Sequence, residues 1–150
     1  MFYVYIFLVI VGVLIVVSIP LGIIGDKIRS KNLEKVFGGR QELNERDFYE
    51  RYFESQSVPF FVIKKIREIL EDVLDADLSR LSAEDDFSKN LNFFWQEDSL
   101  ADVEIFERIE EEFQIKLHQS DFDGLETTTI NDIVNIVWRK VREKNEFSNQ

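Results

Sequence analysis

The sequence DSLADVEIFERIEEEF, residues 98–113, decides the fold of this chain. Its apolar side chains recur at steps of three and four, which indicates an amphipathic helix with one apolar face. Asp98 is a residue type favoured at an N-cap, so we expect the helix to run from Asp98 to Phe113, with Ser99 in its first turn. We expect Ile105 to lie at the edge of the apolar face. The side chains expected to face inward are Leu100, Val103, Phe106, Ile109 and Phe113.

A serine at such a helix start is exposed to solvent. Unpaired backbone N–H groups and the helix dipole favour a phosphate at this end of a helix. A phosphodiester on Ser99 would therefore be stabilised, and the acidic face of the helix would offer a docking surface to basic proteins. The alternative is that Ser99 only starts the helix, a position where serine is common.

Other segments of the chain also have helical patterns. Pro59 suits a first helical position and Asp75-Ala-Asp77 should end that helix. The polar stretch that follows, as far as about Glu97, carries enough large apolar groups to fold down over a core. Thr128 and Thr129 should cap a last helix. The sequence contains no alternating strand pattern, so the helical segments predict a small all-α bundle. The residues of these two helices that should face inward are Ile63, Ile66, Leu70, Val73, Leu74, Ile130, Ile133, Val134, Val137 and Val141.

The N-terminal run Phe2–Ile24 contains no charged residue. As a helix its 23 residues would be about 34 Å long, enough to cross a bilayer core of about 30 Å. A cleaved signal peptide is the alternative, although no basic residue precedes the run. Positive residues should stay in the cytoplasm, so we expect a single-pass membrane protein, of a bacterial inner membrane, with its C-terminal domain in the cytoplasm. Those positive residues are Lys27, Arg29, Lys31, Lys35 and Arg40.

The expected organisation has four parts. They are a transmembrane anchor at 1–25, a juxtamembrane linker at 26–57, a helical domain at 58–142 and a flexible tail at 143–150. Within the linker an amphipathic helix near 44–54 carries an aromatic stripe that should pack on the domain, a partner or membrane-surface contact being the alternative. The stripe consists of Phe48, Tyr49, Tyr52 and Phe53.

Composition excludes several functions. Residues 61–150 hold 11 basic and 22 acidic residues, so the net charge of −11 lies entirely there and disfavours nucleic acid as a partner. The chain has no cysteine, which excludes disulfides, thiolate metal sites and cysteine nucleophiles. His118 is the single histidine, so a surface role is expected for it rather than metal binding. We expect no metal site and no enzymatic activity.

Residues 98–117 resemble the modification site of acyl carrier proteins, in which Asp-Ser-Leu opens the second helix and a Glu-Glu-Glu-Phe ending follows. Leu81-Ser-Ala-Glu-Asp-Asp-Phe87 is similar to the loop before that site in carriers. Phe122–Val137, with Thr-Thr-Ile at 128–130, is similar to their third and fourth helices, and Pro59–Leu74 to their first. The resemblance covers about residues 58–142 and implies a four-helix carrier bundle.

The resemblance also implies roles for individual residues. Ser99 would carry covalent 4′-phosphopantetheine, transferred from coenzyme A by a phosphopantetheinyl transferase, with Asp98 and Leu100 beside it. Acidic residues would face the transferase and the acyl-loading and acyl-transfer enzymes through their basic docking surfaces: Asp102, Glu104, Glu110 and Glu111. An apolar interior would shelter the acyl chain: Val103, Phe106, Ile109, Phe113, Ile130 and Val134.

Two functions from different classes follow. The first is a membrane-tethered acyl carrier that presents thioester-linked acyl groups to enzymes of lipid or secondary metabolism, where a tether would raise its local concentration. The second is an unmodified, carrier-like adaptor that binds a basic protein through its acidic helix. Attachment of the arm to Ser99 distinguishes the two.

Overall fold

The computed structural model of the chain describes residues 28–125 and 128–148 and divides the chain into two compact units, Met1–Gly38 and Gly39–Gln150. In the first unit residues 28–37, which we assigned to a linker, are helical. Gly38 closes this helix with its N–H donating to the Glu34 carbonyl oxygen at 2.8 Å. A Cβ on Gly38 would lie 2.4 Å from that oxygen, and Gly39 has a φ of +75°, so both positions require glycine.

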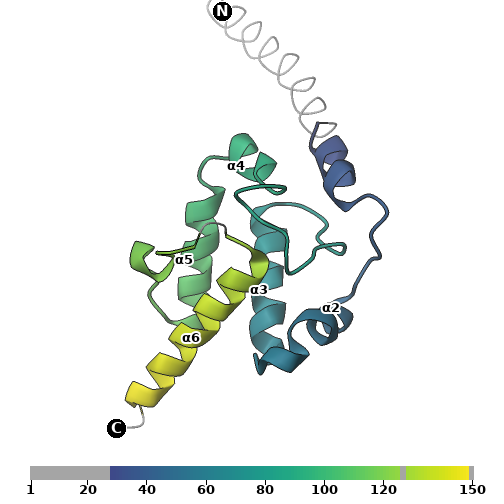
Figure 1. Cartoon of the computed structure of the whole chain (residues 1–150). Helices are drawn as coiled ribbons and strands as arrows, with labels where there is room; N and C mark the ends of the chain where they lie inside the picture. The colour runs from purple at the N-terminus through teal and green to yellow at the C-terminus, as the bar shows by residue number, and fades with distance from the viewer. Residues whose placement is uncertain (1–27, 126–127, 149–150) are drawn as a thin grey trace, which may run out of the picture. The chain divides into compact units, whose positions relative to one another are not determined.

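The second unit is helical in its described part, which confirms the prediction of an all-α fold (Figure 1). The nearest approach to a sheet among the described residues is one isolated antiparallel bridge between Asp86 and Thr129. The elements are, in order, α2 (Glu45–Tyr52), η1 (Glu54–Gln56), α3 (Phe60–Val73), α4 (Phe93–Glu97), α5 (Ala101–Phe113), η2 (Gln119–Asp121) and α6 (Ile130–Ser148). In place of the expected third helix, the described residues have only the short 3-10 turn η2 just before Phe122, and α6 continues through most of the expected tail.

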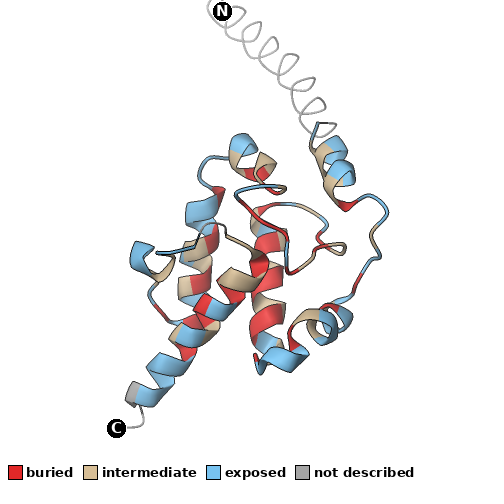
Figure 2. Cartoon of the chain, viewed as in Figure 1, coloured by how far each residue is buried: buried red, intermediate tan, exposed pale blue. Residues whose placement is uncertain are grey.

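Helix α3 lies at the centre, with α2, α5 and α6 packed around it (Figures 1 and 2). It begins at Phe60, one residue later than predicted, with Pro59 as its N-cap, and the left-handed Asp75, at φ 44°, follows its end. Its buried side is formed by Val62, Ile63, Ile66, Arg67 and Leu70, and α6 supplies Ile130, Ile133, Val134, Val137 and Val141. Burying side chains of this kind contributes about 1.5–3 kcal/mol each, so these faces hold the bundle together.

Helix α2 belongs to the bundle, as the packing interpretation of its aromatic stripe predicted. Phe48 and Phe53 are 1% and 0% exposed. Arg67 of α3 lies over the Phe48 ring at 5.3 Å and donates to the Leu43 carbonyl oxygen at 3.0 Å. In η1, which follows α2, the Gln56 side-chain amide donates to the Asn131 side-chain oxygen of α6 at 3.0 Å. The carrier-like bundle therefore has an additional helical layer before α3.

The start of α6 is capped by a reciprocal pair. The Thr129 hydroxyl accepts from the Asp132 N–H at 3.1 Å, and the Asp132 carboxylate accepts from the Thr129 N–H at 3.0 Å and from its hydroxyl at 2.7 Å. This geometry confirms the predicted cap at Thr129.

Replacing Thr129 with alanine is expected to lower the free energy of unfolding by about 1 kcal/mol, because the Asp132 N–H loses its acceptor. Urea denaturation would measure the change. Thr128→Ala is the matched control, since Thr128 contributes backbone N–H and carbonyl groups to its contacts. Equal losses in the two variants would contradict the role of the cap.

One sequence-based prediction is corrected here. Within residues 28–125 and 128–148, no helix is both long and apolar enough to cross a bilayer. This finding overturns the predicted membrane location. The segment at residues 2–24, on which that prediction rested, lies outside the described residues.

Candidate functional site

Ser99 lies exposed in a turn between α4 and α5. Asp98 shapes this turn, because its carboxylate accepts from the Leu100 N–H at 2.9 Å. The N-cap of α5 is Leu100, and the helix begins at Ala101 rather than at Asp98 as predicted. Ser99 therefore lies two residues before the first helical residue instead of in the first turn of the helix. The reason is local: the Asp98 side chain bonds two residues ahead in an Asx turn, which competes with helix formation.

The position still suits a phosphate. Ser99 adjoins the N-terminus of the 13-residue helix α5, where the dipole is positive and backbone N–H groups point outward. Its two neighbours, Asp98 and Leu100, are exposed as well. An enzyme can therefore approach the Ser99 hydroxyl without unfolding of the bundle, and the residues present fit a covalent phosphodiester.

The buried face of α5 agrees with the predicted one at Ile109 and Phe113 and differs from it nearer the start of the helix. Ala101, Ile105, Ile109 and Phe113 are buried, in steps of four, whereas Leu100 is 68% and Val103 is 49% exposed. At about 100° per residue, Leu100 lies on the opposite side of the helix from Ile109, and Val103 lies about 120° away from it. Steps of three rotate away from a helical face faster than steps of four, which explains why the predicted row leaves the core.

A cleft of about 650 Å³ opens beside α5. Its apolar lining comes from the loop before α4, from α4 and α5, from the segment around η2 and from α6, and polar residues also line it. Two of its lining residues flank Ser99 in the sequence: Trp95 lies four residues before Ser99 and Val103 four residues after it. The apolar lining consists of Phe87, Trp95, Val103, Ile105, Phe106, Leu117, Phe122 and Ile133.

Only part of the predicted acyl pocket borders this cleft. Val103 and Phe106 line it. The other four predicted residues are packed in the core, with exposures of 0% to 8%: Ile109, Phe113, Ile130 and Val134. They face the centre of the bundle, where close packing leaves little space. The cleft instead uses side chains from the loop and from α4 that the sequence pattern did not assign to a pocket.

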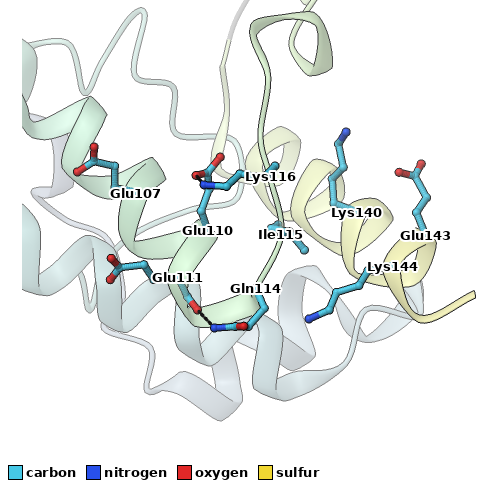
Figure 3. A pocket seen from close by; sticks show the side chains of 9 residues that line it. All are labelled: Glu107, Glu110, Glu111, Gln114, Ile115, Lys116, Lys140, Glu143 and Lys144. Carbon is cyan, nitrogen blue, oxygen red and sulfur yellow. Dashed lines mark hydrogen bonds and ion pairs between the residues drawn. The ribbon is translucent and has the colours of Figure 1, made fainter. Parts of the chain in front are cut away.

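Among the acidic residues predicted to bind partners, Asp102, Glu104 and Glu111 are exposed on α5. Glu104 forms an ion pair with Arg108 at 2.7 Å. Glu110 differs, because its carboxylate accepts from Lys116 at 2.7 Å and from the Leu117 N–H at 2.7 Å. Figure 3 shows Lys116 against Glu110 in a polar pocket between the end of α5 and α6. Glu110 therefore holds the chain that leaves α5.

The hydrogen bond from Lys116, followed by that from the Leu117 N–H, holds the pKa of Glu110 below its ordinary value. A carboxyl whose pKa is depressed on folding stabilises the fold above its unfolded pKa of about 4.3, and this stabilisation is lost as the pH falls through the lower folded pKa. Glu110→Gln should therefore show a smaller loss of unfolding free energy between pH 7 and pH 3 than the wild-type protein.

Urea denaturation at several pH values would measure this difference. Glu111→Gln removes the same charge from the neighbouring exposed position and should retain the wild-type dependence on pH. If both variants lost the same part of that dependence, net charge rather than the bonds of Glu110 would be responsible.

Asp85 and Asp86 are structural residues that the sequence analysis did not single out. They are 2% and 3% exposed. Asp85 accepts from Arg40 at 2.7 and 2.9 Å, while Asp86 accepts from the Ser88 hydroxyl at 2.7 Å. Burial raises the pKa of Asp86, but the bonds from Ser88, Lys89 and the Thr128 N–H outweigh burial and the pKa lies below its ordinary value. These carboxylates fix the loop that leads to α4 and Ser99.

Comparison with known families agrees with the site. Residues 64–137 match the family model for the phosphopantetheine attachment site. No curated protein and no solved structure gives a significant match to the chain. The match supports membership of a phosphopantetheine-binding carrier family, and it includes α4, α5 and the turn that holds Ser99.

Covalent 4′-phosphopantetheine is accordingly the cofactor of the matched domain. Carrier domains of this kind are not catalytic themselves. In general they work with a phosphopantetheinyl transferase and with enzymes that handle acyl groups.

Proposed function

We propose that this protein is an acyl carrier protein whose arm is attached at Ser99. The observation that carries the proposal is the exposed turn at Ser99, next to the N-terminus of α5 and within the matched residues 64–137. In the modification the Ser99 oxygen bonds to the phosphorus next to the pantetheine of coenzyme A. The bond from that phosphorus to the bridging oxygen of the diphosphate breaks, adenosine 3′,5′-bisphosphate leaves, and the serine proton passes to a base of the transferase.

The bound arm supplies a flexible chain ending in a thiol, which holds an acyl group as a thioester. The residues of the protein present and shelter that acyl group. The cleft beside α5 supports this role, because a volume of about 650 Å³ lies in the usual range of small-molecule sites, about 300–1,000 Å³. Its lining residues Val103 and Phe106 were predicted for this purpose, and Trp95 and Phe87 complete an apolar wall.

The partner enzymes would approach α5. Asp102 and Glu111 are exposed there with Glu104, and the chain carries a net charge of −11. Such a surface attracts basic docking surfaces and speeds encounter with them. We propose that these partners are a phosphopantetheinyl transferase and acyl-loading and acyl-transfer enzymes of lipid or secondary metabolism.

The test is co-expression with a broad-specificity phosphopantetheinyl transferase, followed by measurement of intact mass and by peptide mapping. The proposal expects one phosphopantetheinyl group, located on the peptide that contains Ser99. A protein that stays unmodified would favour the adaptor function instead, in which the acidic helix alone binds a basic partner. A group on another serine would contradict the assignment to Ser99.

A further inference from the structure

Two pairs of aromatic rings line the cleft beside α5. Phe87 and Trp95 are stacked, with centroids 4.6 Å apart and planes 21° apart. The Phe106 and Phe122 rings meet edge to face, with centroids 5.2 Å apart and an interplanar angle of 63°. All four rings border the same space. Four of the eight apolar residues that line the cleft are therefore aromatic.

Burial indicates how the first pair works. Phe87 is only 2% exposed, whereas Trp95 is partly exposed on α4. The stacked phenyl ring therefore supports the indole and fixes its plane. A ring held in this way loses little conformational freedom when a ligand binds it, and aromatic pairs gain attraction beyond the burial of their area.

Three carboxylates also line the cleft, those of Asp102, Glu107 and Glu110, together with His118 and neutral polar groups. A long methylene chain that reached these residues would place apolar surface against charged groups. An aromatic ring is compact enough to remain within the apolar part, and its positive edge suits neighbouring carboxylates. Its compact shape and its positive edge both favour an aromatic group over a long methylene chain.

We propose that the cleft receives a planar aromatic acyl group, and that Trp95 is the residue that selects it. This inference rests on the proposed attachment of the arm to Ser99 and adds the class of cargo. Trp95 acts by stacking on the ring of the cargo, with Phe87 behind it.

The test compares two cargoes that differ in aromaticity but keep a six-membered ring. A broad-specificity transferase would load Ser99 from benzoyl-coenzyme A or from cyclohexanecarbonyl-coenzyme A. The rate at which hydroxylamine cleaves each thioester on the protein is divided by the rate for the same acyl group on free pantetheine. This ratio measures how far the cleft protects the cargo, and intact mass follows the cleavage.

Benzoyl should be protected about 2- to 10-fold more than cyclohexanecarbonyl. Trp95→Leu should abolish this difference and Trp95→Phe should retain most of it. Trp138→Leu is the matched control, because Trp138 lies on α6 beside Arg142, outside the cleft lining. It should leave the difference unchanged. Since the difference is taken between two cargoes on one variant, any general loss of stability affects both alike.

The outcomes separate the two proposals. Loading at Ser99 with equal protection of the two cargoes would overturn the aromatic preference and leave the carrier function intact. A preference that survived Trp95→Leu would overturn the role of Trp95. Failure of Ser99 to accept any arm would overturn the carrier function and, with it, this inference.

Discussion

The Ser99→Ala variant should accept no phosphopantetheinyl group under conditions in which the wild-type protein is fully modified. The loss should be complete rather than partial, because alanine offers no oxygen to form the phosphodiester. The fold should be unaffected: Ser99 is exposed, and substitutions at such positions usually change the free energy of unfolding by no more than about 0.5 kcal/mol. Intact mass measures the first effect and urea denaturation the second.

Ser120→Ala provides the matched control for this experiment. Ser120 is also exposed and lies in η2, so its replacement removes a similar hydroxyl away from α5. This variant should be modified like the wild-type protein. If Ser99→Ala were still modified, or if Ser120→Ala were not, the site would lie elsewhere than the turn before α5.

Replacing Asp85 with alanine should lower the free energy of unfolding by about 3 kcal/mol. The Asp85 carboxylate accepts from Arg40, from the Ser82 N–H at 2.7 Å and from the Asn90 side chain at 2.6 Å. All three donors would lose this acceptor at a site that is almost closed to water. The Arg40 side chain is 35% exposed, so water can partly solvate its charge and the loss should lie at the low end for a broken buried pair.

Urea denaturation of Asp85→Ala beside Glu84→Ala would test this prediction. Glu84 is the exposed neighbour of Asp85 and its replacement should cost no more than about 0.5 kcal/mol. A double-mutant cycle with Arg40→Met would separate the ion pair from the other two hydrogen bonds. A small effect of Asp85→Ala alone would mean that the loop is held by other contacts.

Periodic apolar residues and terminal signals were sufficient to predict α3 and the start of α6. Both helices have a strong apolar stripe, and their starts are marked by Pro59 and Thr129. The end of α5 at Phe113 was also predicted correctly. In these places local conformational preference and tertiary packing favour the same structure, which makes the pattern informative.

The start of α5 and its buried face could not be read from the same pattern. Asp98 is equally suited to an N-cap and to an Asx turn, and the structure has the turn. Rows of apolar residues at steps of three and of four both occur in α5, and only packing against α3 selects the row through Ala101, Ile105 and Ile109. The cleft was missed in part because Trp95 and Phe87 reach it from outside the long helices.

The long-range bonds of Asp85 and Asp86 were not predictable either, because these two partners are distant in sequence. Arg40 is 45 residues away from Asp85, and the Thr128 N–H that Asp86 accepts is 42 residues away. An acidic pair in a polar loop ordinarily indicates a solvated surface. Only the folded chain brings the donors to these carboxylates.

The same loop is joined to the start of α6 by main-chain bonds. The Phe87 N–H donates to Thr128, the Ile130 N–H to Asp85 and the Asn131 N–H to Ala83, at 2.9–3.1 Å. Phe87 and Ile133 therefore form a rigid wall of the cleft, because the two segments that carry them are joined by these backbone hydrogen bonds. Cargoes of different thickness should consequently meet Phe87 and Ile133 at the same fixed position.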